Sequence, residues 1–262
     1  GGIAVYKRVV SDVPSDLKTA QNPKKFKVRV TIYNKQIDTV ATSINGTYGD
    51  FTFTNGVSNV LEVTDGGMRT VTGIETGYRF KVEEVYEGDN STDASIYKVT
   101  SQVGAGTIKE NKITEMGVVG TDASASFTNE REKGELTVSK KLISDAAADA
   151  NAKFTFHVKL YENNGDTEAV PISKTYGGMQ FVNGETTVEV TGGESVTAKG
   201  LPAGLRYVVT EDSATGFTLT GVTKDGAPVG SNQVEGTIKK ANGAMLQFTN
   251  TADTGYLELE NS

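Results

Sequence analysis

The sequence contains the same unit twice, with its segments in the same order. A duplication of this kind restricts the chain to folds in which one supersecondary unit is built twice. The matching segments are residues 3–7 and 136–140, 25–33 and 153–161, 77–84 and 204–211, 106–109 and 236–239, and 127–129 and 248–250. A short charged segment, residues 130–134, separates the two copies. We therefore expect two domains, residues 1–132 and 133–262.

Hydrophobic and polar residues alternate along the matching segments. In residues 153–161, Phe154, Phe156, Val158 and Leu160 share one parity and polar residues occupy the other. A period of two is that of a strand with one buried and one wet face. The 30 glycines of the chain supply many tight turns between such strands. We predict an all-β protein made of two tandem β-sandwich domains.

Composition excludes several classes of function. The net charge of -7 argues against a nucleic-acid partner, which needs a concentrated basic surface. The chain has no cysteine, so disulfides, thiolate metal sites and cysteine nucleophiles are absent. No apolar run reaches the length of about 18 residues that a membrane helix needs, so we expect no membrane contact in this segment. Residues 1–5 lack the pattern of a signal peptide, so a secreted protein would be represented here by its mature part.

Three polar residues in each half share the parity of the buried hydrophobic residues. They are Lys7, Glu84 and Asn129 in the first half and Lys140, Glu211 and Asn250 in the second. The intervals between them are 77 and 45 residues in the first half and 71 and 39 in the second. Each interval is six residues shorter in the second half, which shorter loops explain, so the two sets are equivalent. An unpaired buried polar group costs roughly 2–7 kcal/mol, so the three residues of each half must contact one another.

Two interpretations of these buried residues are open. The simpler one is a buried salt bridge with an amide hydrogen-bonded to it. In the covalent one, the lysine amine attacks the asparagine side-chain carbonyl and ammonia leaves. Burial can lower the pKa of a lysine to about 5–6 and raise that of a glutamate to about 8–9, which gives a neutral nucleophile and a proton donor. We expect the aromatic walls of the two sites to be Phe80, Phe127, Tyr207 and Phe248.

Both halves resemble the Cna-B-type domains of Gram-positive pilins and adhesins, in particular the streptococcal T-antigen backbone pilin family. The second half carries the lysine strand at residues 136–140, a Leu-Pro turn at 200–204, the acidic strand at 207–211 and the closing asparagine motif at 248–250. The first half has residues 73–77 in place of the Leu-Pro turn. The resemblance implies Ig-like β-sandwiches in which Lys7 bonds Asn129 and Lys140 bonds Asn250. It assigns Glu84 and Glu211 as the respective catalysts.

The same resemblance implies the function. We expect an extracellular structural protein of the cell wall, a pilus shaft subunit or adhesin stalk, whose isopeptide bonds resist pulling and proteolysis. Its expected partners are other pilin subunits joined by sortase, or the rest of a stalk. Host matrix is a further candidate partner. It is not expected to be an enzyme beyond one turnover on itself, and no cofactor or metal is expected. The alternative is a ligand-binding adhesin region that recognises host matrix or glycan through exposed loops.

Four weaker signals favour plain interpretations. His157 is the only histidine and has outward parity, so it offers no basis for a Ser-His-Asp triad. The acidic loop at residues 87–93 lacks an EF-hand pattern, so a surface loop is favoured over a calcium site. Residues 22–25 (Asn-Pro-Lys-Lys) resemble a sortase acceptor motif only weakly, so a turn is favoured. Residues 256–259 are expected to begin an interdomain or further strand.

Overall fold

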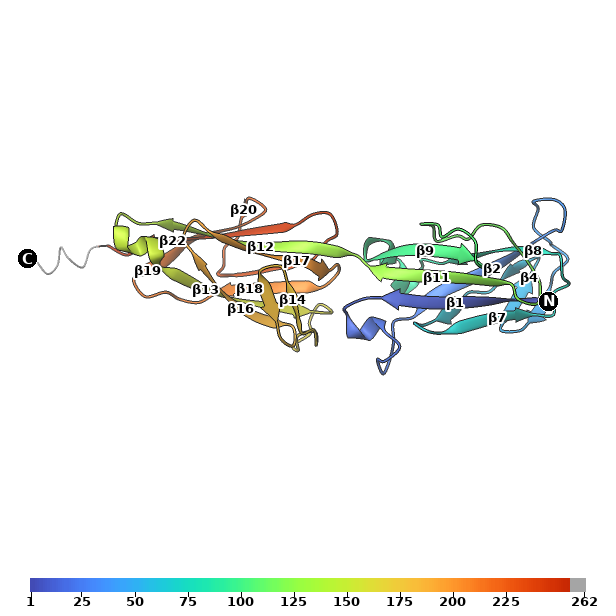
Figure 1. Cartoon of the computed structure of the whole chain (residues 1–262). Coiled ribbons are helices and arrows are strands. Elements are labelled where there is room, and N and C mark those ends of the chain that lie inside the picture. The colour runs from blue at the N-terminus through green and yellow to red at the C-terminus, as the bar shows by residue number, and fades with distance from the viewer. Residues whose placement is uncertain (255–262) are drawn as a thin grey trace, which may run out of the picture. The chain divides into compact units, whose positions relative to one another are not determined.

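The computed structural model describes residues 1–254 of the chain (Figure 1). It divides into two compact units, Gly1–Glu132 and Lys133–Ser262, called unit 1 and unit 2 below. The regular structure of the described residues is almost all strand, which confirms the prediction of an all-β fold. Short 3-10 helices lie at Pro14–Asp16, Gly88–Asn90, Asp93–Ser95 and Ala147–Asn151. The strand expected at residues 256–259 falls outside the described residues.

Unit 1 is built from two sheets. The first has the order β7 (Met68–Thr72), β1 (Gly2–Val10), β11 (Ser124–Arg131) and β9 (Tyr97–Val103). The second begins with β10 (Gly117–Val118), β8 (Arg79–Glu84) and β2 (Phe26–Tyr33), and continues through β5 (Val57–Ser58), β4 (Phe51–Thr54) and β3 (Gly46–Tyr48). A short strand, β6 (Leu61–Val63), also pairs with β2. The strands β1 and β11 run parallel to each other, so the first and last strands of the unit are neighbours.

Unit 2 repeats the central strands of this arrangement. Its first sheet has the order β17 (Ser195–Pro202), β12 (Lys133–Ile143), β22 (Ala244–Ala252), β19 (Phe217–Lys224) and β20 (Ala227–Pro228). Its second has the order β16 (Glu185–Thr191), β13 (Lys153–Tyr161), β18 (Arg206–Glu211) and β21 (Gln233–Thr237). A separate hairpin joins β14 (Lys174–Tyr176) to β15 (Met179–Phe181). Again the first and last described strands of the unit, β12 and β22, are parallel.

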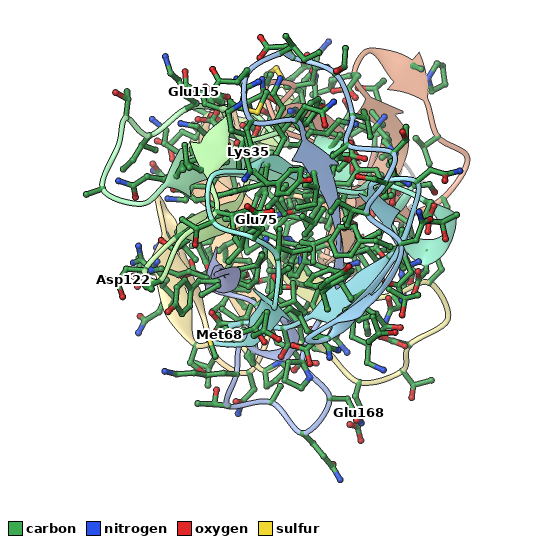
Figure 2. The ribbon with its side chains drawn as sticks, turned by 90° about the vertical axis from the view of Figure 1, so that its right-hand side faces the viewer. Lys35, Met68, Glu75, Glu115, Asp122 and Glu168 are labelled. Carbon is green, nitrogen blue, oxygen red and sulfur yellow. The ribbon has the colours of Figure 1, made fainter. Side chains whose placement is uncertain are left out.

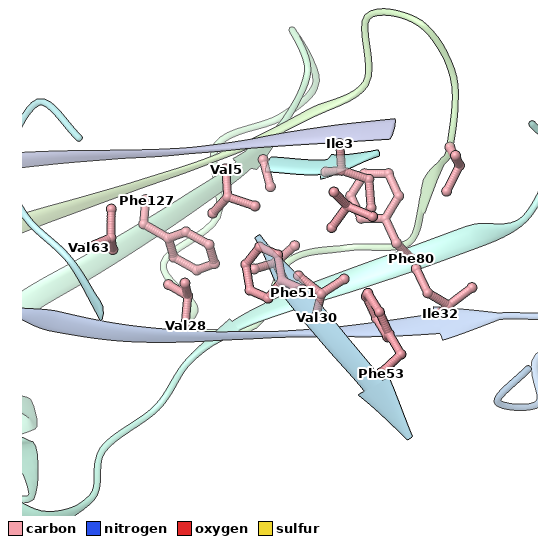
Figure 3. Packing of buried hydrophobic residues seen from close by; sticks show 14 of the residues in the cluster. Ile3, Val5, Val28, Val30, Ile32, Phe51, Phe53, Val63, Phe80 and Phe127 are labelled. Carbon is pink, nitrogen blue, oxygen red and sulfur yellow. The ribbon is translucent and has the colours of Figure 1, made fainter. Parts of the chain in front are cut away.

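The hydrophobic core of unit 1 lies between its two sheets (Figure 3). Val5 of β1 and Phe127 of β11 face Val28 and Val30 of β2, and Phe51 of β4 fills the space beside them. All five side chains are 1% exposed or less. Burying a side chain of this size contributes about 1.5–3 kcal/mol, so the alternation seen in the sequence fixes which face of each strand turns inward.

Two Asn-Gly turns close equivalent hairpins. Asn55 and Gly56 have φ values of 50° and 82°, and Asn183 and Gly184 have 49° and 77°. A two-residue turn with both residues in the left-handed region matches the twist of the strands it joins, and Asn-Gly is the pair that best accepts it. An exposed ion pair of unit 1 joins Lys35 and Glu75, with Lys35 Nζ 2.6 Å from Glu75 Oε1 (Figure 2).

The strand pairing corrects one match of the repeat. The sequence match of residues 106–109 with 236–239 is wrong, because a different segment of unit 1 takes the place of 236–239. Gly236 of β21 lies opposite Tyr207, and Gly117 of β10 lies opposite Phe80 at the equivalent place in unit 1. Residues 117–119 are therefore the true equivalents of 236–238. The error arose because short glycine-containing segments resemble each other, whereas pairing with a buried strand distinguishes them.

Candidate functional site

The site in unit 1 begins with two residues on adjacent parallel strands. Lys7 of β1 lies opposite Phe127 in the ladder, and Asn129 of β11 lies opposite Val9. The two residues are thus offset by one strand period, so their side chains leave the sheet on the same inward face. Lys7 is 3% exposed and Asn129 is 0% exposed. The amine of Lys7 contacts Asn129 Oδ1.

The third residue comes from the facing sheet. Glu84 is the last residue of β8, lies opposite Val28 of β2 and is 1% exposed. Lys7 Nζ donates to Glu84 Oε2 at 2.8 Å, and Asn129 Nδ2 donates to Glu84 Oε1 at 2.6 Å. The carboxylate therefore bridges the two groups that the first sheet supplies. The outward neighbour Glu83 instead pairs with Arg29 near the surface.

Unit 2 assembles an equivalent site. Lys140 of β12 lies opposite Phe248, and Asn250 of β22 lies opposite Leu142. The amine of Lys140 contacts Asn250 Oδ1 and donates to Glu211 Oε2 at 2.8 Å. Lys140, Glu211 and Asn250 are 2%, 4% and 2% exposed, whereas the adjacent Lys141 and Asp212 are exposed. The structure thus brings together both sets of three residues that parity singled out.

Sequence reasoning missed the aromatic rings that lie nearest the lysine amines. Lys7 Nζ lies 4.1 Å from the centre of the Phe26 ring, and Lys140 Nζ lies 4.4 Å from that of Phe154. A second ring, Phe156, is 5.9 Å from the Lys140 amine. The expected walls Phe80, Phe127, Tyr207 and Phe248 are all buried, and Phe248 packs edge-on against Phe156. The available signal was the repeat itself, which aligns Phe26 with Phe154 on the inward parity.

Burial dominates the electrostatics of both lysines. Desolvation lowers the pKa of Lys7 to about 8, although the charge of Glu84 and its hydrogen bond act in the opposite direction. Desolvation likewise lowers the pKa of Lys140 against the hydrogen bond and charge of Glu211. Removing water from an ammonium favours its neutral form, which is the nucleophilic one. The arrangement can therefore present an amine to an amide with a carboxylate in contact with both.

A second set of buried polar groups lies beside the site in unit 1. Lys24 Nζ is 5.7 Å from the centre of the Phe26 ring and 3.1 Å from Asp93 Oδ1. Asn90 Nδ2 donates to Asp93 Oδ2 at 2.8 Å, and both residues are buried. The carboxylate of Asp93 raises the pKa of Lys7, against the larger effect of burial. The acidic loop at residues 87–93 is thus partly interior, unlike the surface loop that the sequence favoured.

The described residues hold neither a metal cluster nor a buried histidine. Within residues 1–254 there is no group of three or more His, Cys, Asp or Glu side chains arranged to hold a metal ion. His157 lies on an exposed strand face, with Nε2 2.9 Å from Asp212 Oδ2 and Nδ1 3.1 Å from Thr187 Oγ1. In the described part of the chain, no helix is long and apolar enough to cross a bilayer.

Parts of the sequence are similar to a protein family and to a pilus adhesin. Residues 134–252 match a family described as a domain of unknown function (DUF7601). Over 96 residues, which are 37% of this chain, the sequence is 29% identical to the pilus tip adhesin Cpa of Streptococcus pyogenes. That match spans 14% of the adhesin's length.

Solved structures share the fold over nearly the whole chain. The major pilin protein T3.2 of Streptococcus pyogenes is 18% identical, with a TM-score of 0.53, and the match covers 96% of this chain and 98% of that one. Another major pilin from Streptococcus pyogenes is 19% identical, with a TM-score of 0.51, and covers 96% and 97%. At these identities the likeness is one of fold.

Proposed function

We propose that this chain, which is similar to Gram-positive pilins and pilus adhesins, is a structural segment of a cell-surface shaft or stalk whose two units each close an internal isopeptide bond. Lys7 joins Asn129 in residues 1–132, and Lys140 joins Asn250 in residues 133–262. The observation that carries the proposal is the buried contact between lysine amine and asparagine amide in both units.

The chemistry is a transamidation that needs no cofactor. The neutral amine of Lys7 attacks Cγ of Asn129, forms a C–N bond and breaks the bond from Cγ to Nδ2. Glu84 is placed to take a proton from the amine and deliver it to Nδ2, which leaves as ammonia. Holding the amine and amide in contact supplies an effective molarity on the order of 10⁵–10⁸ M. Each site acts once, so the chain is not an enzyme in the usual sense.

The position of the bond determines what it does under tension. Because β1 and β11 are parallel neighbours, the chain enters unit 1 at one end of this strand pair and leaves it at the other end. Pulling on the two ends would shear β1 against β11, which hydrogen bonds alone would have to resist. A covalent bond from Lys7 to Asn129 carries that force directly and leaves residues 8–128 outside the path of the load. Unlike a disulfide, such a bond is unaffected by reductants.

The proposed setting follows from the same likeness. The segment would lie outside the cell in a wall-anchored protein, joined through sortase to other pilin subunits or continuous with the rest of a stalk. The alternative role, an adhesin region that binds host matrix or glycan, has the sequence match to a tip adhesin in its favour. It stays a prediction, as the match covers a small part of that protein.

The deciding experiment is the intact mass of the purified, denatured chain. Two bonds would lower the mass by two ammonia masses from the sequence value. The variants Glu84→Ala and Glu211→Ala should each restore one ammonia, whereas the outward neighbours Glu83→Ala and Asp212→Ala should restore none. Tandem mass spectrometry should recover a branched peptide containing Lys7 and Asn129. The full sequence mass in the wild-type chain would reject the covalent proposal and leave buried ion pairs.

A further inference from the structure

One corner of unit 2 places a phenol and an amine over the same glycine. Tyr207 of β18 lies opposite Gly236 of β21. The point that a Gly236 Cβ would occupy is in contact with the Tyr207 hydroxyl and is 2.7 Å from Lys224 Nζ. Lys224 reaches this place from β19 and donates to the carbonyl oxygen of Glu235 at 2.8 Å. The glycine therefore leaves room for two polar groups to approach each other.

The Tyr207 hydroxyl has no hydrogen-bond partner although the residue is 0% exposed. Most buried side-chain hydroxyls in proteins are paired, because an unpaired one forfeits its hydrogen bonds to water. Burial, assisted by the charge of Asp225, raises the pKa of Tyr207 to about 12. The phenol is therefore protonated at neutral pH and is available as a donor.

The equivalent corner of unit 1 is apolar. Phe80 stands where Tyr207 does, and the point of a Gly117 Cβ meets the Phe80 ring and lies 2.9 Å from Val103 Cγ1. Val103 is the unit 1 equivalent of Lys224. Val103 pairs with Ala125 of β11, and Lys224 pairs with Leu246 of β22, at the same position of the two ladders. Unit 2 thus carries two polar groups at one place where the same fold needs only hydrophobic packing.

A cavity of about 650 Å³ lies above this corner. Its polar lining residues are Tyr207, Lys224, Asp225, Thr237, Lys239 and Asn242. Asp225 uses Oδ1 to accept the backbone N–H of Met245 at 2.8 Å. The lining therefore offers two ammonium groups and a phenol as donors, a hydroxyl and an amide that can donate or accept, and one carboxylate as an acceptor. That balance suits a ligand with an anionic group beside a hydroxyl.

We propose that this cavity binds the carboxylate of an acidic sugar. The carboxylate would accept hydrogen bonds from Lys224 and Lys239, and rotation of the Lys224 side chain away from Glu235 would open the way to the Tyr207 hydroxyl. A neighbouring sugar hydroxyl would donate to Asp225. The volume is within the usual range for small-molecule sites and suits a monosaccharide at the end of a glycan. This site is separate from the lysine–asparagine contacts and does not depend on the proposed cross-links.

The test is a titration of the whole ¹⁵N-labelled chain with sodium glucuronate, followed by NMR. The amide signals of Gly236, Thr237 and Asn242 should shift and saturate. Glucose at the same concentration should have no effect, since it lacks the carboxylate. N-acetylaspartate methylamide, which mimics an acidic side chain, should bind more weakly because it has no hydroxyl for Asp225. Binding of that compound alone, or no saturable shift with glucuronate, would overturn the proposal.

Variants that restore the unit 1 residues give a second readout. Lys224→Val should abolish the glucuronate shifts, and Tyr207→Phe should weaken binding about tenfold, as expected for one hydrogen bond to a charged group. Lys153→Val, on an exposed face of the opposite sheet, is the matched control and should bind as the wild type does. Tyr207→Phe should also raise the melting temperature, because it removes an unpaired buried hydroxyl. Unchanged binding in both corner variants would place the ligand elsewhere and reject this site.

Discussion

Lys7 and Asn129 lie one strand period apart on neighbouring parallel strands, with the Lys7 amine against the Asn129 side chain. Lys140 and Asn250 have the same offset in unit 2. A residue directly opposite the lysine would meet its aliphatic stem, whereas the residue two positions further meets the amine. Each lysine therefore meets its asparagine with its amine, and its side chain is fully buried on the way.

Glu211→Gln should remove the bond of unit 2 and leave that of unit 1. The bond would close a loop of 110 residues, for which the chain-entropy account of cross-links gives about 5 kcal/mol. The unfolding free energy of unit 2, measured by hydrogen exchange of its peptides, should fall by at least that amount. Asp212→Asn, on the exposed side of the same strand end, should cost no more than about 1 kcal/mol. Equal effects of the two changes would contradict the assignment.

An unbonded Lys7 should make stability depend on pH. In Asn129→Ala the bond cannot form, and the folded pKa of Lys7, about 8, stays below its unfolded value of 10.5. Between these values the unfolded chain binds more protons, so stability should rise with pH by roughly 3 kcal/mol across this window. Denaturant unfolding at several pH values measures the slope.

The control for this pH dependence is Lys7→Met combined with Asn129→Ala, which lacks the titrating amine. The unfolding free energy of this double variant should change less with pH than that of the single variant. The bonded wild-type chain should also lack the rise, because an amide nitrogen does not titrate in this range. A slope that falls with pH in the single variant, relative to the double, would mean that Lys7 is held charged.

Phe26→Leu should slow bond formation in unit 1. The Phe26 ring covers the Lys7 amine at 4.1 Å, and a smaller side chain would admit water and favour the charged form. Chain prepared unfolded in denaturant and then refolded should show a several-fold smaller bonded fraction of unit 1 at early times, read by mass spectrometry. The expected loss of stability is about 1–2 kcal/mol.

Phe53→Leu is the matched control, because Phe53 belongs to the same core and is 2% exposed but packs against the rings of Tyr48 and Phe51. This control substitution should lower the stability of unit 1 by a similar amount and leave the rate of bond formation unchanged. The bond of unit 2 in the same sample provides an internal standard. Equal slowing by both variants would assign the effect to folding and not to the ring.

The sequence predicted the members of each site because strand parity is a strong constraint. A period of two leaves one inward face, so Lys7, Glu84 and Asn129 had to be interior and had to satisfy one another. It could not predict Phe26 or Phe154 as the nearest rings. Parity tells which face a side chain takes, but the neighbouring strand and its register come only from the folded sheet.

The acidic loop illustrates a second limit. Residues 87–93 are polar enough to be read as surface, yet Asn90 and Asp93 are buried. Asn90 Nδ2 donates to the backbone carbonyl of Lys25 at 2.9 Å, and Asp93 pairs with Lys24. These contacts join segments almost 70 residues apart, so no local pattern in either segment reveals them. Burial here follows from tertiary partners and not from hydrophobicity.

A buried ion cluster distinguishes the two units and yields the last prediction. In unit 1, Asp16 is 2% exposed and accepts hydrogen bonds from Ser11 at 2.6 Å, Tyr97 at 2.5 Å and Arg131 at 3.0 Å. The equivalent Asp149 of unit 2 is half-buried and accepts from Ser144.

Asp16→Ala should therefore cost about 3–5 kcal/mol, because it removes the carboxylate that faces the buried guanidinium of Arg131. Asp149→Ala should cost about 1 kcal/mol, the worth of one ordinary hydrogen bond. Hydrogen exchange of peptides from each unit measures both losses in the intact chain, and the unchanged unit serves as the reference. Since neither residue is among those proposed to form or catalyse the bonds, each variant should still weigh two ammonia masses less than the value calculated from its own sequence. Similar costs for both variants would show that the Asp16 cluster adds no more than a surface turn does.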